Sequence, residues 1–184
     1  MPTLRTFIAV PIPSTPALRS VIARLAAMGR ALKPVDPDHL HLTLKFLGDT
    51  DAGQVPAIGS AVRESVSGRQ VFDLTLRGTG VFPHARRPTV VWAGIENAEP
   101  LIAIVAELEP RLEALGFTRE HRAYQPHLTL ARIRSRPPAD LTELLERERA
   151  AEFGAAAVES VVVYQSDLQP GGPVYTPLET VGLE

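Results

Sequence analysis

The chain has 184 residues, a formal net charge of −2 and no cysteine. A chain of this length can form one domain or two small lobes, and its slight acidity argues against a protein that coats nucleic acid. The lack of cysteine excludes disulfides, thiolate metal sites and cysteine nucleophiles, and it favours a reducing compartment. With no export signal and no apolar run long enough to span a bilayer, we expect a cytoplasmic protein without membrane contact.

Hydrophobic periodicity predicts alternating strands and helices along the first half of the chain. Strands are predicted where apolar residues alternate, and helices where they recur every three or four residues. The predicted elements are a strand at Thr6 to Ile12, a helix at Pro16 to Met28, a strand closed by Gly48, a helix at Asp51 to Val66, and strands at Val71 to Leu76 and Thr89 to Ile95.

The second half repeats this order. Its predicted elements are a helix at Pro100 to Leu115, a strand through Ile133, a helix at Ala139 to Arg149, and strands at Ala156 to Gln165 and Val174 to Val181. Shifted back by 86 residues, helix 100–115 falls on 14–29, helix 139–149 on 53–63, and the last two strands on 70–79 and 88–95.

A common shift of this kind indicates an internal duplication. We therefore predict an α+β fold of two similar lobes, each with two helices and a mainly antiparallel sheet, about a pseudo-twofold cleft. The single domain covers residues 1–184, with lobes at about 1–95 and 96–184, and the terminal strands are candidates for exchange between the lobes. The alternative is an ordinary α+β domain whose elements happen to be evenly spaced.

The same shift relates two copies of His-Leu-Thr-Leu, at residues 41–44 and 127–130. A given histidine would be followed by Leu-Thr-Leu by chance roughly one time in a thousand, so two copies among five histidines indicate function. Side chains on a strand alternate between its faces. His41, Thr43 and Lys45 are thus predicted on one face, with Leu42, Leu44 and Phe46 on the other.

The second copy places His127 and Thr129 together by the same alternation. Two such strands facing each other across a twofold axis would bring two histidines and two threonines into one cleft. This suits in-line displacement at phosphorus, in which a base and an acid flank the phosphate from opposite sides. The threonine hydroxyls can donate to phosphate oxygens, and Lys45 or Arg132 can balance the charge.

Two features leave alternatives open. Strict alternation puts Arg132 on the apolar face, so it reaches the cleft only if the strand has ended or bulged there. His39, His41 and His127 together could hold zinc, although His39 has no counterpart in the second copy, where Gln125 stands. The acid–base scheme itself requires no metal or other cofactor. A module that only binds nucleotides or RNA ends would also need such a cleft.

The motifs and their flanks resemble the two-histidine (2H) phosphoesterases, and among them the RNA 2′,3′-cyclic phosphodiesterases, also called 2′-5′ RNA ligases. The resemblance extends over nearly the whole chain. It rests on Arg5–Val10, His41–Gly48, Trp92–Gly94, Pro126–Arg132 and Ser166–Tyr175.

The resemblance implies hydrolysis of RNA 2′,3′-cyclic phosphate ends to 2′-phosphomonoesters, with 2′-5′ ligation as the reverse reaction. It implies that His41 is the proton donor and His127 the proton acceptor. It also implies that Thr43, Thr129 and Arg132 bind the phosphate. Phe46 and Tyr124 are candidates to stack on the terminal base, with core packing as the alternative. The expected partners are RNA ends, including tRNA fragments, or nucleotides, and we expect a monomer.

Overall fold

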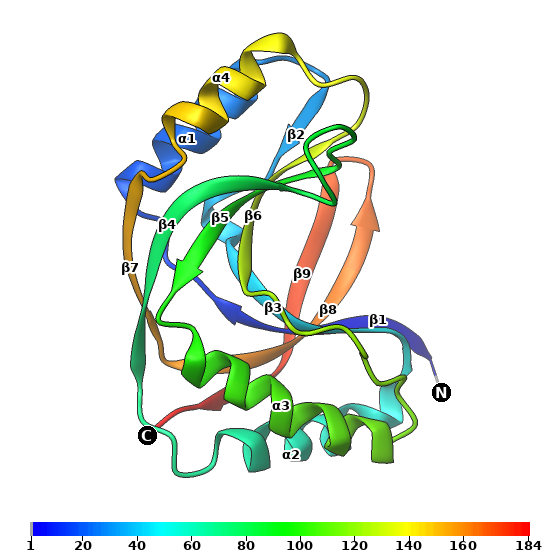
Figure 1. Cartoon of the computed structure of the whole chain (residues 1–184). Coiled ribbons are helices and arrows are strands. Elements are labelled where there is room, and N and C mark those ends of the chain that lie inside the picture. Colours follow the sequence, from blue (N-terminus) through cyan, green and yellow to red (C-terminus); the bar gives the residue numbers. More distant parts are fainter. Residues whose placement is uncertain (1) are drawn as a thin grey trace.

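The computed structural model describes residues 2–184, which form two antiparallel sheets and two pairs of α-helices (Figure 1). The first sheet, sheet A, has the strand order β3-β1-β8-β9, and the second, sheet B, has the order β2-β6-β5-β4-β7. The strands of sheet A are β1 (Thr3–Pro11), β3 (His41–Asp51), β8 (Ser160–Gln169) and β9 (Gly172–Gly182). Those of sheet B are β2 (Leu32–Pro34), β4 (Phe72–Phe82), β5 (Val90–Glu96), β6 (His127–Ile133) and β7 (Glu152–Val158).

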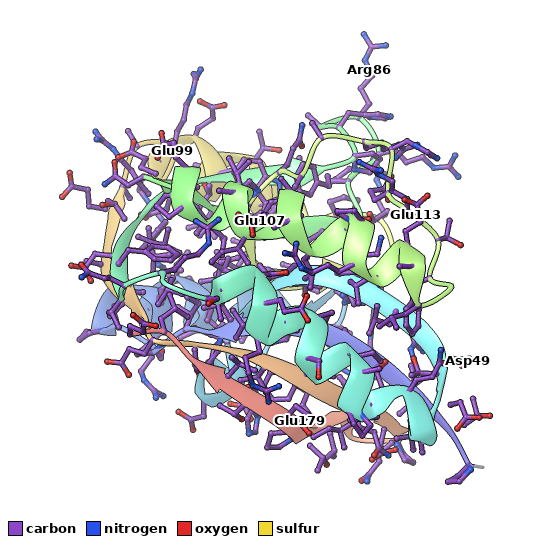
Figure 2. All side chains as sticks on the ribbon, turned by 90° about the horizontal axis from the view of Figure 1, so that it is seen from below. Asp49, Arg86, Glu99, Glu107, Glu113 and Glu179 are labelled. Atoms are coloured by element: carbon purple, nitrogen blue, oxygen red, sulfur yellow. The ribbon has the colours of Figure 1, made fainter. Side chains whose placement is uncertain are left out.

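The helices lie in two pairs at opposite ends of the molecule, with the sheets between them (Figure 1). One pair, α1 (Pro16–Ala27) and α4 (Ala139–Arg147), contacts strands of sheet B. In the other pair, α2 (Val55–Val66) packs on β8 and β9 of sheet A and on its neighbour α3 (Glu99–Ala114). Figure 2 shows α2 and α3 side by side, with Glu99, Glu107 and Glu113 along α3. None of the helices in residues 2–184 combines the length and the apolar composition needed to cross a bilayer.

Local sequence explains why α1 begins where it does. The Thr15 hydroxyl accepts a hydrogen bond from the backbone N–H of Leu18, and Pro16 occupies the first helical position, where its missing N–H has no cost. The same hydroxyl donates to the carbonyl of Phe153 on β7. Four residues at helical spacing then bury one face of the helix in the common core, namely Leu18, Val21, Ile22 and Leu25. The cap therefore both starts α1 and fastens it to sheet B.

The predicted α+β duplication is present, but its two halves are interleaved. Strand β4 follows α2 and joins sheet B, whereas β8 follows α4 and β7 and joins sheet A. Helix α1 follows β1 of sheet A, leads into β2 of sheet B and contacts sheet B. A boundary near residue 95 therefore does not separate the two sheets, because each contains strands from both halves of the chain.

Three details of the predicted elements are wrong. The strand predicted at Ala156 to Gln165 is two strands, β7 and β8, which separate at Glu159 and enter different sheets. The continuous apolar run on both sides of Glu159 gives no sign of this change of sheet. The predicted equivalence of the last strand, β9, with β5 is also wrong. Strand β5 pairs with the second motif strand, β6, in the way that β1 pairs with the first, β3, so the counterpart of β5 is β1. Periodicity does not predict strand β2, since Leu32–Pro34 is too short to show a period.

Gly80 on β4 lies directly against the side chain of its neighbour Trp92 on β5. A Cβ atom there would lie 2.2 Å from a ring carbon of Trp92, far inside van der Waals contact. We expect Gly80→Ala to lower the free energy of unfolding by about 1–3 kcal/mol, because the indole must move out of a packed position. Thermal melting measures the change. Gly171→Ala is the control, because no atom lies within 4 Å of its Cβ position, and equal melting temperatures for the two variants would contradict the prediction.

Candidate active site

The first motif strand contains a β-bulge that redirects its side chains. In the β1–β3 pairing, Ile8 faces Lys45 and Ala9 faces Thr43, so Leu44 has no partner. An extra residue reverses the alternation beyond it. Leu44 and Lys45 are consequently both buried, and Phe46 is 66% exposed. The predicted faces of Lys45 and Phe46 are thus exchanged: Phe46 lies on the side of His41, and Lys45 does not.

The second motif strand has the same bulge at the equivalent position. In the β5–β6 pairing, Val91 faces Ala131 and Trp92 faces Thr129, which leaves Leu130 unpaired. Ala131 is fully buried and Arg132 is exposed. Strict alternation would place Arg132 on the apolar face of the strand. The bulge instead turns its side chain to the face that carries His127 and Thr129.

Both histidines are held in the same way by the backbone of their own strand. His41 Nδ1 lies 3.0 Å from the carbonyl oxygen of His39, and His127 Nδ1 lies 2.8 Å from that of Gln125. A carbonyl oxygen can only accept, so Nδ1 carries the hydrogen in each ring. Nε2 is left as the atom that can take up or release a proton toward a ligand.

Aromatic side chains surround each imidazole. The ring centres of Phe7 and Tyr175 lie 5.2 and 5.1 Å from that of His41. The Phe82 ring meets His127 edge to face at 4.8 Å. The imidazole orientations are therefore fixed by packing as well as by hydrogen bonds. Phe7, Phe82, Tyr164 and Tyr175 are not among the predicted site residues, because they come from strands whose register with the motif strands is set by long-range pairing.

The two motif strands contact each other without forming a ladder, and Tyr124 links them. Its hydroxyl donates to the carbonyl oxygen of Thr43 at 3.0 Å. Burial raises the pKa of Tyr124, which keeps the donor protonated. Its ring is partly buried and packs against the core. Among residues 2–184, neither the Thr43 nor the Thr129 hydroxyl has a hydrogen-bond partner that meets ordinary distance and angle limits, and both are only partly buried.

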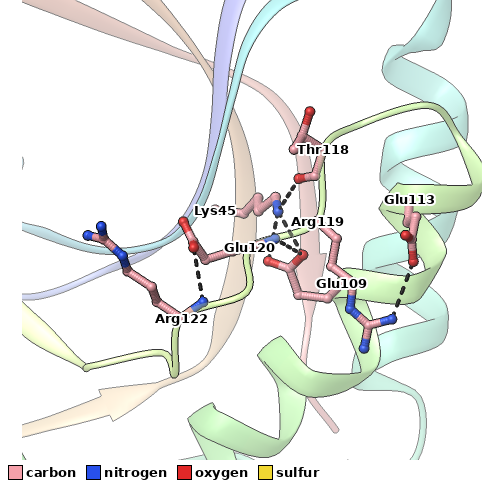
Figure 3. Close-up of polar contacts among 7 residues, drawn as sticks. All are labelled: Lys45, Glu109, Glu113, Thr118, Arg119, Glu120 and Arg122. Atoms are coloured by element: carbon pink, nitrogen blue, oxygen red, sulfur yellow. Dashed lines mark hydrogen bonds and ion pairs between the residues drawn. The ribbon is translucent and has the colours of Figure 1, made fainter.

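Lys45, which we predicted to line the cleft, is instead part of a buried ionic network (Figure 3). Its Nζ lies 2.8 and 2.7 Å from the two carboxylate oxygens of Glu109 on α3 and 2.8 Å from the carbonyl oxygen of Thr118. Glu109 also accepts from the backbone N–H of Glu120 at 3.1 Å. The network therefore ties β3 to the segment that runs from α3 to His127.

Charge and burial act on His41 in the same direction. Burial lowers the pKa of His41, the hydrogen bond to the His39 carbonyl opposes this, and the positive charge of Arg132 lowers the pKa further. Arg132 also acts on the Tyr175 hydroxyl. Although Arg132 belongs to the second motif strand, its charge therefore reaches the histidine of the first.

A hollow adjoins His41, and its lining does not include His127. It has a volume of about 400 Å³ and includes Pro11, His39, Ser160, Tyr164 and Tyr175 in its lining. His39 faces Asp36, with Nδ1 3.1 Å from the carboxylate. Within residues 2–184 no group of three histidine, aspartate or glutamate side chains is arranged to hold a metal ion. The three-histidine zinc site considered from the sequence is therefore not formed by these side chains.

Comparisons with known proteins show which proteins this chain is similar to. The family model of the 2′-5′ RNA ligase superfamily matches residues 12–170. An RNA 2′,3′-cyclic phosphodiesterase of Methanothermobacter thermautotrophicus is 36% identical over 98% of this chain and 99% of its own length. A protein of the same name from Aquifex aeolicus is 33% identical over 80% of this chain and 79% of its own.

Solved structures show the same fold. TT0787 of Thermus thermophilus superposes with a TM-score of 0.82 at 32% identity, over 97% of both chains. E. coli LigT complexed with 3′-AMP superposes with a TM-score of 0.78 at 27% identity, over 99% of both chains. The likeness therefore includes both motif strands and both helix pairs.

The influence of Arg132 on His41 can be measured directly. We expect Arg132→Gln to raise the pKa of His41, because it removes a positive charge that disfavours the imidazolium. NMR titration of the His41 ring protons gives the pKa in each protein. Arg149→Gln, on the α4 side of the molecule, is the control. An unchanged or lower His41 pKa in Arg132→Gln would mean that Arg132 does not face the site.

The buried ion pair makes a prediction about stability. Lys45 and Glu109 have side chains only 8% and 12% exposed, so removing one partner leaves the other charge buried and unpaired. Lys45→Met and Glu109→Leu should each cost about 3–5 kcal/mol of unfolding free energy. The double variant should cost clearly less than their sum, as measured by urea denaturation. Additive losses would show that the two charges do not interact.

Proposed function

This chain belongs to the 2′-5′ RNA ligase superfamily, and on that premise we propose that it is an RNA 2′,3′-cyclic phosphodiesterase. The proposed substrate is an RNA end or nucleotide with a 2′,3′-cyclic phosphate, and the product a 2′-phosphomonoester. The observation that carries the proposal is the matched pair of histidines. Each is fixed through Nδ1 on a bulged strand, and each keeps Nε2 for proton transfer.

The proposed reaction is an in-line displacement with two proton transfers. His127 Nε2 takes a proton from water while the water oxygen forms a bond to phosphorus. The bond from phosphorus to the 3′ oxygen breaks, and His41 Nε2 gives its proton to that oxygen. Each transfer typically contributes about 10²–10⁴-fold to the rate. The 2′ ester bond stays intact, so the phosphate remains on the 2′ oxygen.

The remaining polar groups have roles in holding the phosphate. Thr43 and Thr129 are free to donate their hydroxyl hydrogens to the non-bridging oxygens, and Arg132 supplies a positive charge on the same face. The bulge in β6 supports this role for Arg132. Lys45 is left out of the proposed phosphate site because Glu109 neutralises it in the core. Phe46 is exposed beside Phe7, where it is available for stacking with a base.

The lowered pKa of His41 has to be reconciled with a role as acid. In the free protein, burial and Arg132 favour the neutral imidazole. A bound cyclic phosphate brings a negative charge to the site, and an opposite charge favours the imidazolium. We therefore propose that substrate binding itself supplies the protonated form of His41.

The same site could also accept a 5′ hydroxyl in place of water as the attacking group. Attack of a 5′ hydroxyl on the cyclic phosphate would give a 2′-5′ linkage without a nucleotide cofactor, with His127 and His41 transferring the same two protons. Water is in large excess, so we propose hydrolysis as the principal reaction and ligation as the second. Ligation would require two RNA ends held together.

Turnover of 2′,3′-cyclic AMP in EDTA tests the proposal. We expect a 2′-phosphate product by ³¹P NMR, and a loss of about 10²–10⁴-fold in kcat for both His41→Ala and His127→Ala. His121→Ala is the matched control, because this side chain is exposed and does not line the hollow beside His41. A 3′-phosphate product would reverse the assignment of the leaving oxygen. Binding without turnover in the wild-type protein would indicate a binding module instead.

A further inference from the structure

Positive charge is concentrated in three segments of a chain that is acidic overall. Residues 29–34, 82–90 and 131–137 together contain seven arginine and lysine residues and no aspartate or glutamate. The first segment contributes Arg30 and Lys33, and the second Arg86 and Arg87. The third contributes Arg132, Arg134 and Arg136.

Hydrogen bonds place these three segments side by side at one end of sheet B. Arg132 is paired with Lys33 on one side and with Val90 on the other. The backbone N–H of Arg134 donates to the carbonyl of Ala31 at 2.8 Å. The N–H of Ile133 donates to the carbonyl of Thr89, also at 2.8 Å. Three stretches that are far apart in sequence therefore form one continuous surface, which we call the basic surface.

The charges of the basic surface are not neutralised by the part of the chain that the structure describes. Among residues 2–184, ion pairs within 4.0 Å involve arginines elsewhere, such as Arg24 with Glu148 and Arg69 with Glu107. Within the same range, none of the seven cations of the basic surface takes part in one. The side chains of these cations are exposed, except that of Lys33, which is partly buried. Figure 2 shows the Arg86 side chain extending outward from the ribbon. Uncompensated like charges repel one another, so their concentration here favours an anionic ligand.

The basic surface begins inside the candidate site. Arg132 shares a strand face with His127 and Thr129, and its charge acts on His41 and Tyr175. From Arg132 the positive charge continues outward along β2, the end of β6 and the β4–β5 loop. An anionic chain that leaves the cleft in this direction would pass the arginine and lysine side chains of these segments.

We propose that the basic surface binds the phosphates of the RNA strand that precedes the cyclic end. This inference rests on the proposed function and adds the path and the length of the substrate. A single nucleotide would reach Arg132 alone, whereas an oligonucleotide would also contact Arg134, Arg136 and the loop arginines. Such contacts are to the backbone, so they add affinity without selecting a sequence.

The test compares two substrates in one set of variants. A short oligonucleotide and a mononucleotide, both with 2′,3′-cyclic phosphates, are assayed with the wild type, with R134Q/R136Q and with R86Q/R87Q. We expect the ratio of the two kcat/KM values, oligonucleotide over mononucleotide, to fall by roughly 10-fold or more at low salt in each double variant. The slope of log(kcat/KM) against log[salt] for the oligonucleotide should become shallower by about 0.7 for each phosphate that the variant no longer binds.

The control removes two arginines from the opposite end of the molecule. R63Q/R111Q changes the net charge equally, but Arg63 and Arg111 belong to α2 and α3 and already lie near Glu179 and Glu64. It should leave the ratio unchanged. An unchanged ratio in both test variants would overturn the RNA path and leave the phosphodiesterase standing. An equal loss of kcat/KM for both substrates would also overturn the RNA path. The arginines would then act on the cyclic phosphate only by long-range electrostatic attraction. No turnover of either substrate by the wild type would instead refute the proposed function.

Discussion

The arrangement of the site depends on one departure from strand geometry, the extra residue that follows the threonine in each motif strand. Without the bulge, a strand that presents His41 and Thr43 would also present Lys45, and one that presents His127 and Thr129 would bury Arg132. With it, the two residues after each threonine turn inward and the next residue turns outward. The same backbone feature thus gives the first strand a buried cation and an exposed phenylalanine, and the second a buried alanine and an exposed arginine.

These differences make a pseudo-symmetric frame into an asymmetric site. The two histidines have equivalent hydrogen bonds, and both have aromatic neighbours, yet the hollow described above adjoins His41 and not His127. Arg132, where the basic surface begins, belongs to the other strand. An in-line displacement needs different groups on the two sides of phosphorus, since one side receives water and the other releases the ribose oxygen. In the proposed mechanism the repeated motif supplies the two proton carriers, and the different residues at positions 45, 46, 131 and 132 give them different surroundings.

Much of this arrangement could be predicted from the sequence, because most of the elements leave a pattern within a short stretch of the chain. The motifs, both helix pairs and most strands follow from periodicity within short windows, and the shared shift of 86 residues indicated the duplication. The bulges could not be predicted, because Leu-Thr-Leu has the same alternation whether or not a residue is skipped in the ladder. The change of sheet at Glu159 and the aromatic neighbours of His41 depend on pairing between β1 and β8, more than 150 residues apart along the chain. Sequence patterns do not encode register at that distance.

The interleaving of the two halves has a consequence for how the protein moves. In many two-domain enzymes a hinge closes one domain over the substrate, because only one or two connections join the domains. Here the chain passes between the sheets several times, through α1, the β2–β3 connection, α2 and the β7–β8 junction, and a single core includes residues from both helix pairs. Neither half can swing away or fold alone without exposing strands that the other half completes. Such a molecule is better suited to hold a cleft of fixed width than to open and close around its substrate.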